Sequence, residues 1–167
     1  MGQSQRAIED FDKAIQLDPK FAAAYKNRGD TYFELGQFSK AIEDHDKAIQ
    51  LDPGDAWAYE LRGMAYYALG QIERAIRDYE KAIQLNPDDA AARYHLLGLF
   101  YSGLGESQRA IENYDKAIQL DPTHYRDYYV RSGAYEELGQ YERSDQDFDK
   151  AEELDPDYDE CYVPTTD

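Results

Sequence analysis

A five-residue string recurs along this chain at an almost constant interval, and this recurrence restricts the possible folds more than any other feature. The string Lys-Ala-Ile-Gln-Leu begins at Lys13, Lys47, Lys81 and Lys116, and a diverged copy begins at Lys150. Each copy is followed by Asp or Asn and then by proline, and the spacings between copies are 34, 34, 35 and 34 residues. A fixed period of this length is typical of repeat proteins, in which each period forms one supersecondary unit.

Each period contains two segments with helical spacing. Between Ala56 and Pro87, apolar residues recur at three- and four-residue steps around Tyr59 and again over residues 75–85. Gly70 ends the first segment, because glycine readily adopts the left-handed conformation that stops a helix. Pro87 ends the second segment, because proline cannot continue the hydrogen-bond ladder. Ala, Leu, Glu, Lys and Gln favour helix, and β-branched residues are scarce, so the repeating unit is predicted to be a helical hairpin.

The pattern predicts nine helices and no sheet. Asp55 and Asp89 stand where first helices begin, and we expect their side chains to cap those helices. Ala90 is the extra residue of the 35-residue period, and we expect it to lengthen the turn after Pro87. The expected helices lie near residues 4–17, 22–35, 38–51, 56–69, 72–85, 90–104, 107–120, 124–138 and 141–154.

The pattern resembles the tetratricopeptide repeat over residues 2–158. The shared features are glycine at the eighth and fifteenth positions, alanine at the twentieth and twenty-seventh, an aromatic ring near the twenty-fourth and proline at the thirty-second. The matching residues are Gly29, Gly63 and Gly98; Gly36, Gly70, Gly105 and Gly139; Ala41, Ala75 and Ala110; Ala48, Ala82, Ala117 and Ala151; His45, Tyr79, Tyr114 and Phe148; and Pro53, Pro87, Pro122 and Pro156. The resemblance implies an all-α fold, a right-handed superhelical solenoid of antiparallel helix pairs.

On this resemblance, residues 1–158 form one array and residues 159–167 an acidic tail. The array divides into a half repeat and four full repeats, at 1–21, 22–55, 56–90, 91–124 and 125–158. Either the chain is an excerpt of a longer array, which we favour, or the half repeat is native. The last copy has serine at its eighth and twentieth positions and an acidic surface, which is expected of a solvent-facing cap.

Two positions depart from the usual repeat. The fourth position, often Trp in this family, is Tyr in every full copy, and the seventh, often Leu, is usually arginine. The residues are Tyr25, Tyr59, Tyr94 and Tyr128, and Arg28, Arg62, Leu97 and Arg131.

The charge of the chain excludes several classes of partner. The formal net charge is −17, of which residues 136–167 contribute −11. An acidic body repels phosphate backbones and anionic headgroups, so we expect no nucleic acid and no membrane surface as partner. No apolar run approaches the roughly 20 residues that span a bilayer. A basic partner is permitted. The sequence does not identify the compartment, and the cytoplasm is the location we favour.

The sequence contains no recognisable catalytic arrangement. A glycine-rich phosphate loop, an HExxH segment and a GxSxG segment are all absent. The single cysteine, Cys161, allows no intrachain disulfide. Asp155, Asp157 and Asp159 alternate as in a calcium loop, but the glycine and glutamate that such a loop needs are missing. We therefore predict a protein that is not an enzyme and holds no cofactor.

The three histidines are not expected to form a metal site. His45 takes the aromatic position of a second helix and is predicted to lie in the core. His124 falls in a linker, and His95 falls at the fifth position of a first helix.

The resemblance places the second, fifth, ninth and twelfth positions of each repeat on a concave groove. We predict that this groove binds a peptide or helix of a partner protein, centred on Trp57, Met64 and Tyr67, because exposed apolar rings suit anchor residues. Trp57 is the only tryptophan, at a position that the hairpin does not need to fill with a large side chain. The full candidate set is Lys26, Asp30, Phe33, Trp57, Glu60, Met64, Tyr67, His95, Leu99, Arg126 and Tyr129.

Two rival functions remain open. The chain could be a self-association module without a groove ligand, a homo-oligomer formed through the N-terminal helix, where Ala7, Phe11 and Ala14 lack a hairpin partner. It could also be an enzyme or small-molecule binder that uses the solenoid as a wall, a reading that a closed pocket with convergent polar groups would support.

Overall fold

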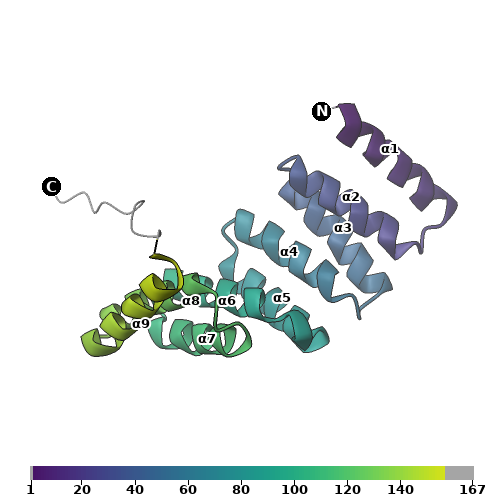
Figure 1. The fold of residues 1–167 in the computed structure, drawn as a ribbon. Coiled ribbons are helices and arrows are strands. Elements are labelled where there is room, and N and C mark those ends of the chain that lie inside the picture. Colours follow the sequence, from purple (N-terminus) through teal and green to yellow (C-terminus); the bar gives the residue numbers. More distant parts are fainter. Residues whose placement is uncertain (1, 157–167) are drawn as a thin grey trace. The chain divides into compact units, whose positions relative to one another are not determined.

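The computed structural model of the protein describes residues 2–156, and within that range it contains helices and no strand (Figure 1). The helices are α1 (Gly2–Leu17), α2 (Ala22–Glu34), α3 (Phe38–Leu51), α4 (Ala56–Ala68), α5 (Ile72–Leu85), α6 (Ala91–Gly103), α7 (Ser107–Leu120), α8 (Tyr125–Glu137) and α9 (Tyr141–Leu154), with a 3-10 turn η1 (Pro87–Asp89). Every helix predicted from the sequence is present, with ends within two residues of the expected ones. The fold is an all-α repeat solenoid. The predicted tail at 159–167 lies outside the described residues.

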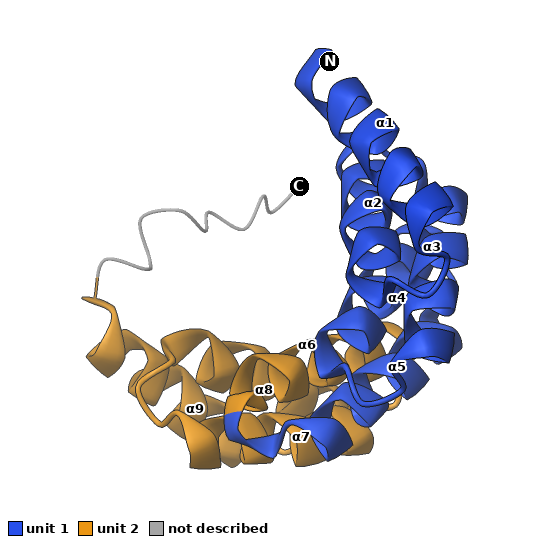
Figure 2. Cartoon of the chain, turned by 90° about the vertical axis from the view of Figure 1, so that its right-hand side faces the viewer, with its two compact units in different colours: residues 1–88 blue, residues 89–167 orange. Residues whose placement is uncertain are grey.

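The chain divides into two compact units, Met1–Asp88 and Asp89–Asp167 (Figure 2). In unit 1, α2 packs on α3 and α4 packs on α5 as hairpins, and α1 lies against α2. In unit 2, α6 packs on α7 and α8 packs on α9 in the same way, with α7 also against α8. Each hairpin therefore buries one face in its own pair and another against its neighbour within the unit.

The turns follow the predicted chemistry with one exception. Gly36, Gly70, Gly105 and Gly139 all adopt φ values between +69° and +73° and end the first helices. Asp55 caps α4 as expected, accepting hydrogen bonds from the backbone N–H groups of Trp57 and Ala58. The prediction for Asp89 is wrong. Because the turn is one residue longer, Asp89 lies in η1, and the buried Ala90 takes the N-cap position of α6 without a side-chain cap.

In three of the four hairpins, an aromatic ring of the core lies against the backbone of the first helix. A Cβ atom added to Gly98 would lie only 2.2 Å from Cε1 of Tyr114, and one added to Gly29 would lie 2.7 Å from the ring of His45. Glycine at the eighth position is therefore a steric requirement of the packing. In the last copy Ser132 occupies this position, and the equivalent ring, Phe148, is 37% exposed. This is the difference expected when a Cβ occupies the place of the ring.

Glycines 98 and 133 allow a paired test of this packing. Gly133 also lies within a helix, α8, but a Cβ there would have no atom within 4 Å. We expect Gly98→Ala to lower the free energy of unfolding by about 1–3 kcal/mol through overpacking. We expect Gly133→Ala to raise it by about 0.5–1 kcal/mol, because alanine loses less backbone entropy. Urea unfolding followed by circular dichroism measures both, and equal effects of the two substitutions would contradict the packing argument.

Arginines at the seventh position link the helices within each unit. Arg62 donates to both oxygens of Asp78, at 2.8 and 2.6 Å, and its third nitrogen donates to Asp46 on the preceding hairpin at 2.6 Å. Bidentate pairs of this kind are strong and directional. The same arrangement recurs in two other copies, as Arg28 with Asp44 and Asp12, and Arg131 with Asp147 and Asp115.

The third copy replaces both partners of the bidentate pair. The buried Leu97 stands where the others have arginine, and Asn113 stands where they have aspartate. Asn113 carries no charge, so this position needs no cation. Its side chain donates a hydrogen bond to the carbonyl oxygen of Arg109 at 2.8 Å. The two substitutions are physically coupled, because a buried aspartate without its arginine would be costly.

The third copy therefore predicts that, in the second copy, replacing both residues of the pair restores the stability that is lost when only the arginine is replaced. We expect Arg62→Leu alone to cost about 3–5 kcal/mol of unfolding free energy, because Asp78 is only 5% exposed and would lose its counter-charge. The double variant Arg62→Leu, Asp78→Asn should recover most of that loss. Denaturant unfolding of the wild type, both single variants and the double variant gives the coupling. A double variant no more stable than Arg62→Leu would show that the pair is not coupled in this way.

Candidate functional site

The predicted groove residues lie on the first helix of each hairpin, and we call their common side the first-helix face. These positions are three or four residues apart, so they share one side of each helix. In unit 1 the face carries Lys26, Asp30 and Phe33 on α2, and Trp57, Glu60, Met64 and Tyr67 on α4. In unit 2 it carries His95 and Leu99 on α6, and Arg126 and Tyr129 on α8.

Aromatic groups are exposed on the first-helix face of unit 1. Trp57 is 48% exposed and Tyr67 is 54% exposed, while Met64 between them is half-buried. The residues equivalent to Trp57 in the other copies are Ala23, Ala92 and Arg126, and all are exposed. The fold therefore does not need a ring at this position, which leaves Trp57 available for contact with another molecule.

Lys26 is engaged within unit 1. Its Nζ lies 2.6 Å from Oδ2 of Asp55, and both side chains are largely shielded. Burial alone would raise the pKa of Asp55, but the hydrogen bond and charge of Lys26 and the two capped N–H groups hold that pKa below its usual value. Lys26 thus secures the start of α4, and a ligand on this face would meet an ion pair and not a free ammonium group.

Asp30 and His45 form a buried polar contact under the same face. Oδ1 of Asp30 lies 3.5 Å from Nε2 of the fully buried His45, without hydrogen-bond geometry. Burial raises the pKa of Asp30 to about 6, helped by the nearby carboxylates of Glu34 and Asp55 and opposed by Lys26. Burial lowers the pKa of His45 to about 4, helped by the charge of Arg62. The predicted core position of His45 is confirmed, and burial stabilises the neutral form of each group relative to its ionised form.

In unit 2 the first-helix face contains two hollows. The first, which we call the histidine hollow, has a volume of about 430 Å³ and is lined by residues that include His95, Arg126, His124 and Asp127. The sequence did not predict that His124 and Asp127 would meet His95. His124 is the N-cap residue of α8, and Asp127 lies in the first turn of that helix, where its carboxylate contacts His95 on α6 of the preceding hairpin.

The second, which we call the acidic hollow, has a volume of about 510 Å³. Leu99, Tyr129 and Phe148 give it apolar walls, and Glu136 and Glu137 add carboxylates. Gly133 also lines it, at the ninth position where the other copies have Asp30, Met64 and Leu99. The hollow is open because this side chain is missing and because Phe148 is not seated in the hairpin core. Leu99 and Tyr129 were predicted as site residues, whereas Gly133 and Phe148 were not.

The predicted self-association residues lie on α1. Ala7, Phe11 and Ala14 are all half-buried, and α1 packs on α2. Their role in self-association stays a prediction.

Comparison with known proteins identifies the family. The profile described as TPR repeat matches residues 1–36 and 29–70, and profiles described as tetratricopeptide repeat match residues 56–89, 91–124 and 128–158. The chain therefore belongs to the tetratricopeptide-repeat family, and it is a protein–protein interaction scaffold. Scaffolds of this family are typically not enzymes. Within residues 2–156, no helix combines the length and the apolar character that a bilayer-spanning segment requires.

Solved structures give a similar result. A crystal structure of MamA is 33% identical, covers 95% of this chain and 92% of its own, and has a TM-score of 0.87. MamA of Desulfovibrio magneticus is 23% identical, with coverage of 95% and 89% and a TM-score of 0.83. YrrB, described as a tetratricopeptide-repeat protein with an unusual peptide-binding site, is 24% identical, with coverage of 94% and 80% and a TM-score of 0.83. Among curated proteins, none matches this sequence.

The buried histidine makes stability depend on pH. As the pH falls below 6.5, the unfolded chain protonates His45 while the folded chain keeps it neutral until about pH 4, so folding loses stability through this window. The substitution His45→Phe introduces the residue type that the last copy has at the equivalent position, Phe148. It should remove this pH-dependent loss of stability. We expect the unfolding free energy of the variant to exceed that of the wild type at pH 8. At pH 5 this difference should be about 2 kcal/mol larger.

Asp30 has the opposite dependence. Its raised pKa favours folding at low pH, and this contribution is lost as the pH rises through about 6. Because Asp30 contacts His45, the effect of His45→Phe is measured in an Asp30→Asn background, in which this second dependence is absent. Urea unfolding at the two pH values measures the difference, and an equal gain at pH 5 and pH 8 would contradict a neutral, buried His45.

Proposed function

We propose that the protein is a peptide-binding scaffold, and that the first-helix face of each unit binds an extended or helical segment of a partner protein. The observation that carries this proposal is the exposure of Trp57 at a position where alanine is sufficient for the fold. Aromatic rings dominate the energetics of protein interfaces when they become buried. Trp57 and Tyr67 lie ten residues apart on α4, which corresponds to about 15 Å along the helix and suits two separate anchor contacts.

The residues that line the acidic hollow are suited to bind a basic side chain of the partner. Leu99, Tyr129 and Phe148 offer apolar surface for the aliphatic stem of a lysine or arginine, and Glu136 and Glu137 offer carboxylates for its charged end. Long basic side chains commonly bury their stems and keep their charged ends in polar surroundings. Glu137 already accepts a hydrogen bond from the Ser107 hydroxyl at 2.5 Å, which fixes the position of that carboxylate.

The class of ligand has support from a second protein. YrrB, which shares the fold, is described as having a peptide-binding site. The position of the site on the present chain is argued only from its own residues.

Selection from a random peptide library displayed on phage, with the full chain as bait, tests the proposal without a known partner. We expect selected peptides to combine bulky apolar residues with lysine or arginine. Fluorescence anisotropy should show that Trp57→Ala, Tyr67→Ala together weaken binding at least tenfold, because each buried anchor contributes about 1.5–3 kcal/mol. Gly133→Leu should weaken the binding of the basic peptides, because the leucine side chain would fill the acidic hollow. A Cβ at this position has no atom within 4 Å, so the helix should tolerate the substitution.

Tyr141→Ala is the matched control. Tyr141 is 66% exposed but lies at the start of α9, a second helix, away from the first-helix face. This control should bind as the wild type does, and all variants should keep their helical circular dichroism. If the double variant binds the selected peptides with unchanged affinity, the first-helix face is not the binding surface. Light scattering of the free chain then decides whether self-association through α1 is its alternative role.

A further inference from the structure

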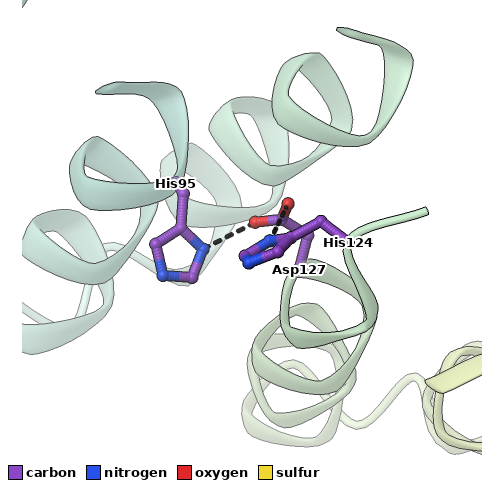
Figure 3. A group of neighbouring side chains, drawn as sticks. All are labelled: His95, His124 and Asp127. Atoms are coloured by element: carbon purple, nitrogen blue, oxygen red, sulfur yellow. Dashed lines mark hydrogen bonds and ion pairs between the residues drawn. The ribbon is translucent and has the colours of Figure 1, made fainter. Parts of the chain in front are cut away.

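In the histidine hollow, the side chain of His95 on α6 meets those of His124 and Asp127 at the start of α8 (Figure 3). Nδ1 of His95, on α6, lies 2.6 Å from Oδ1 of Asp127, and Nδ1 of His124 lies 2.8 Å from Oδ2 of the same carboxylate. One ring nitrogen of each histidine and one carboxylate oxygen all lie within 4.8 Å of one another. The two imidazole rings are nearly perpendicular, at 82°, with centroids 5.4 Å apart.

The repeat does not require a carboxylate at this place. Asp127 is the third residue of its repeat and is only 2% exposed; the equivalent residues are the buried alanines Ala24 and Ala58 in unit 1 and the buried Arg93 in the third copy. Burying a carboxylate is unfavourable unless it is paired or coordinates a metal. The buried Asp127 and the two histidines that face it therefore differ from the alanine packing of the two hairpins of unit 1.

We infer that His95, His124 and Asp127 form a binding site for a divalent transition-metal ion, with Zn²⁺ as the ion that suits them best. Imidazole nitrogen and carboxylate oxygen are ordinary zinc ligands, and two histidines with one carboxylate form a known three-ligand set. A tetrahedral zinc ion with bonds of about 2.0–2.1 Å holds its ligand atoms about 3.3 Å apart. The three candidate ligand atoms lie within 4.8 Å of one another, and rotations of the side chains would bring one carboxylate oxygen and the two ring nitrogens to that spacing.

The surroundings allow an ion to enter and to be held. His95 and His124 have side-chain exposures of 19% and 39%, so the hollow reaches the ligands from solvent. Asp89 and Asp121 also line the hollow and add negative charge around the site. Each imidazole would bind as a neutral ligand through one nitrogen with its proton on the other, and a water molecule would complete four-coordination. The bound ion would tie α6 to the first turn of α8 within unit 2.

Zinc titration of the full chain by isothermal calorimetry tests the inference. The protein should carry no affinity tag and should have Cys161→Ser, because a thiolate is itself a strong zinc ligand. We expect one zinc ion per chain at micromolar affinity or tighter. His95→Gln and His124→Gln should each weaken binding at least tenfold. Asp89→Asn is the matched control, because it removes an exposed carboxylate from the same hollow, and it should change the affinity less than threefold.

Nuclear magnetic resonance of the imidazole groups provides a readout that needs no variant. Zinc should shift the ring resonances of His95 and His124 but not those of His45, which is buried in unit 1. His124→Gln removes little packing, so it should remain folded and decide the matter if His95→Gln does not. If the wild type binds zinc no more tightly than the double variant His95→Gln, His124→Gln, or if the two ring signals do not move, the three side chains form only a hydrogen-bonded network and the inference is wrong.

Discussion

The contact between an aromatic ring of the second helix and a glycine of the first, made in three of the four hairpins, is the interaction on which the other features depend. It brings the two helices of a hairpin close enough for alanines such as Ala75 and Ala110 to be completely buried. The core combines these alanines with buried rings such as Tyr79 and Tyr114 and occupies only part of each repeat. The remaining positions of the first helix are not constrained by packing, and the candidate binding residues lie there. Where the contact is altered, at Ser132 and Phe148, a hollow opens on the same face.

The helices could be predicted from the sequence because each depends on local chemistry that recurs. The positive φ of Gly70 and the proline after each second helix set the ends of the helices, and the period sets their pairing. The turn before α6 could not be predicted in the same way, because one inserted residue moved the cap from Asp89 to Ala90. A single irregular repeat offers no second copy against which to compare it.

The exposure of Trp57 could be predicted because it follows from position within one helix. The meeting of His95 with His124 and Asp127 could not, because it depends on how far two hairpins are shifted along each other. The pairing of Arg62 with Asp78 lies between these cases. Arginine and aspartate are both present in three copies and both replaced in the copy with Leu97 and Asn113, so the sequence contains the signal. The engagement of Lys26 by Asp55 changes the predicted ligand surface, since a cation counted from the sequence is already neutralised.

Dissolved salt screens the charges of this protein to different extents, because the arginine–aspartate pairs are buried and other carboxylates are exposed. The carboxylate of Asp78 is shielded from solvent and held by two hydrogen bonds, so mobile ions screen it weakly. Glu136 and Glu137 lie at the surface, within reach of those ions. A rise in ionic strength would therefore weaken the proposed contact with a basic partner, while the two helices of each hairpin that has such a pair stay linked. Binding and release of such a partner would then depend on the salt concentration of the medium, while the fold of the scaffold stays the same.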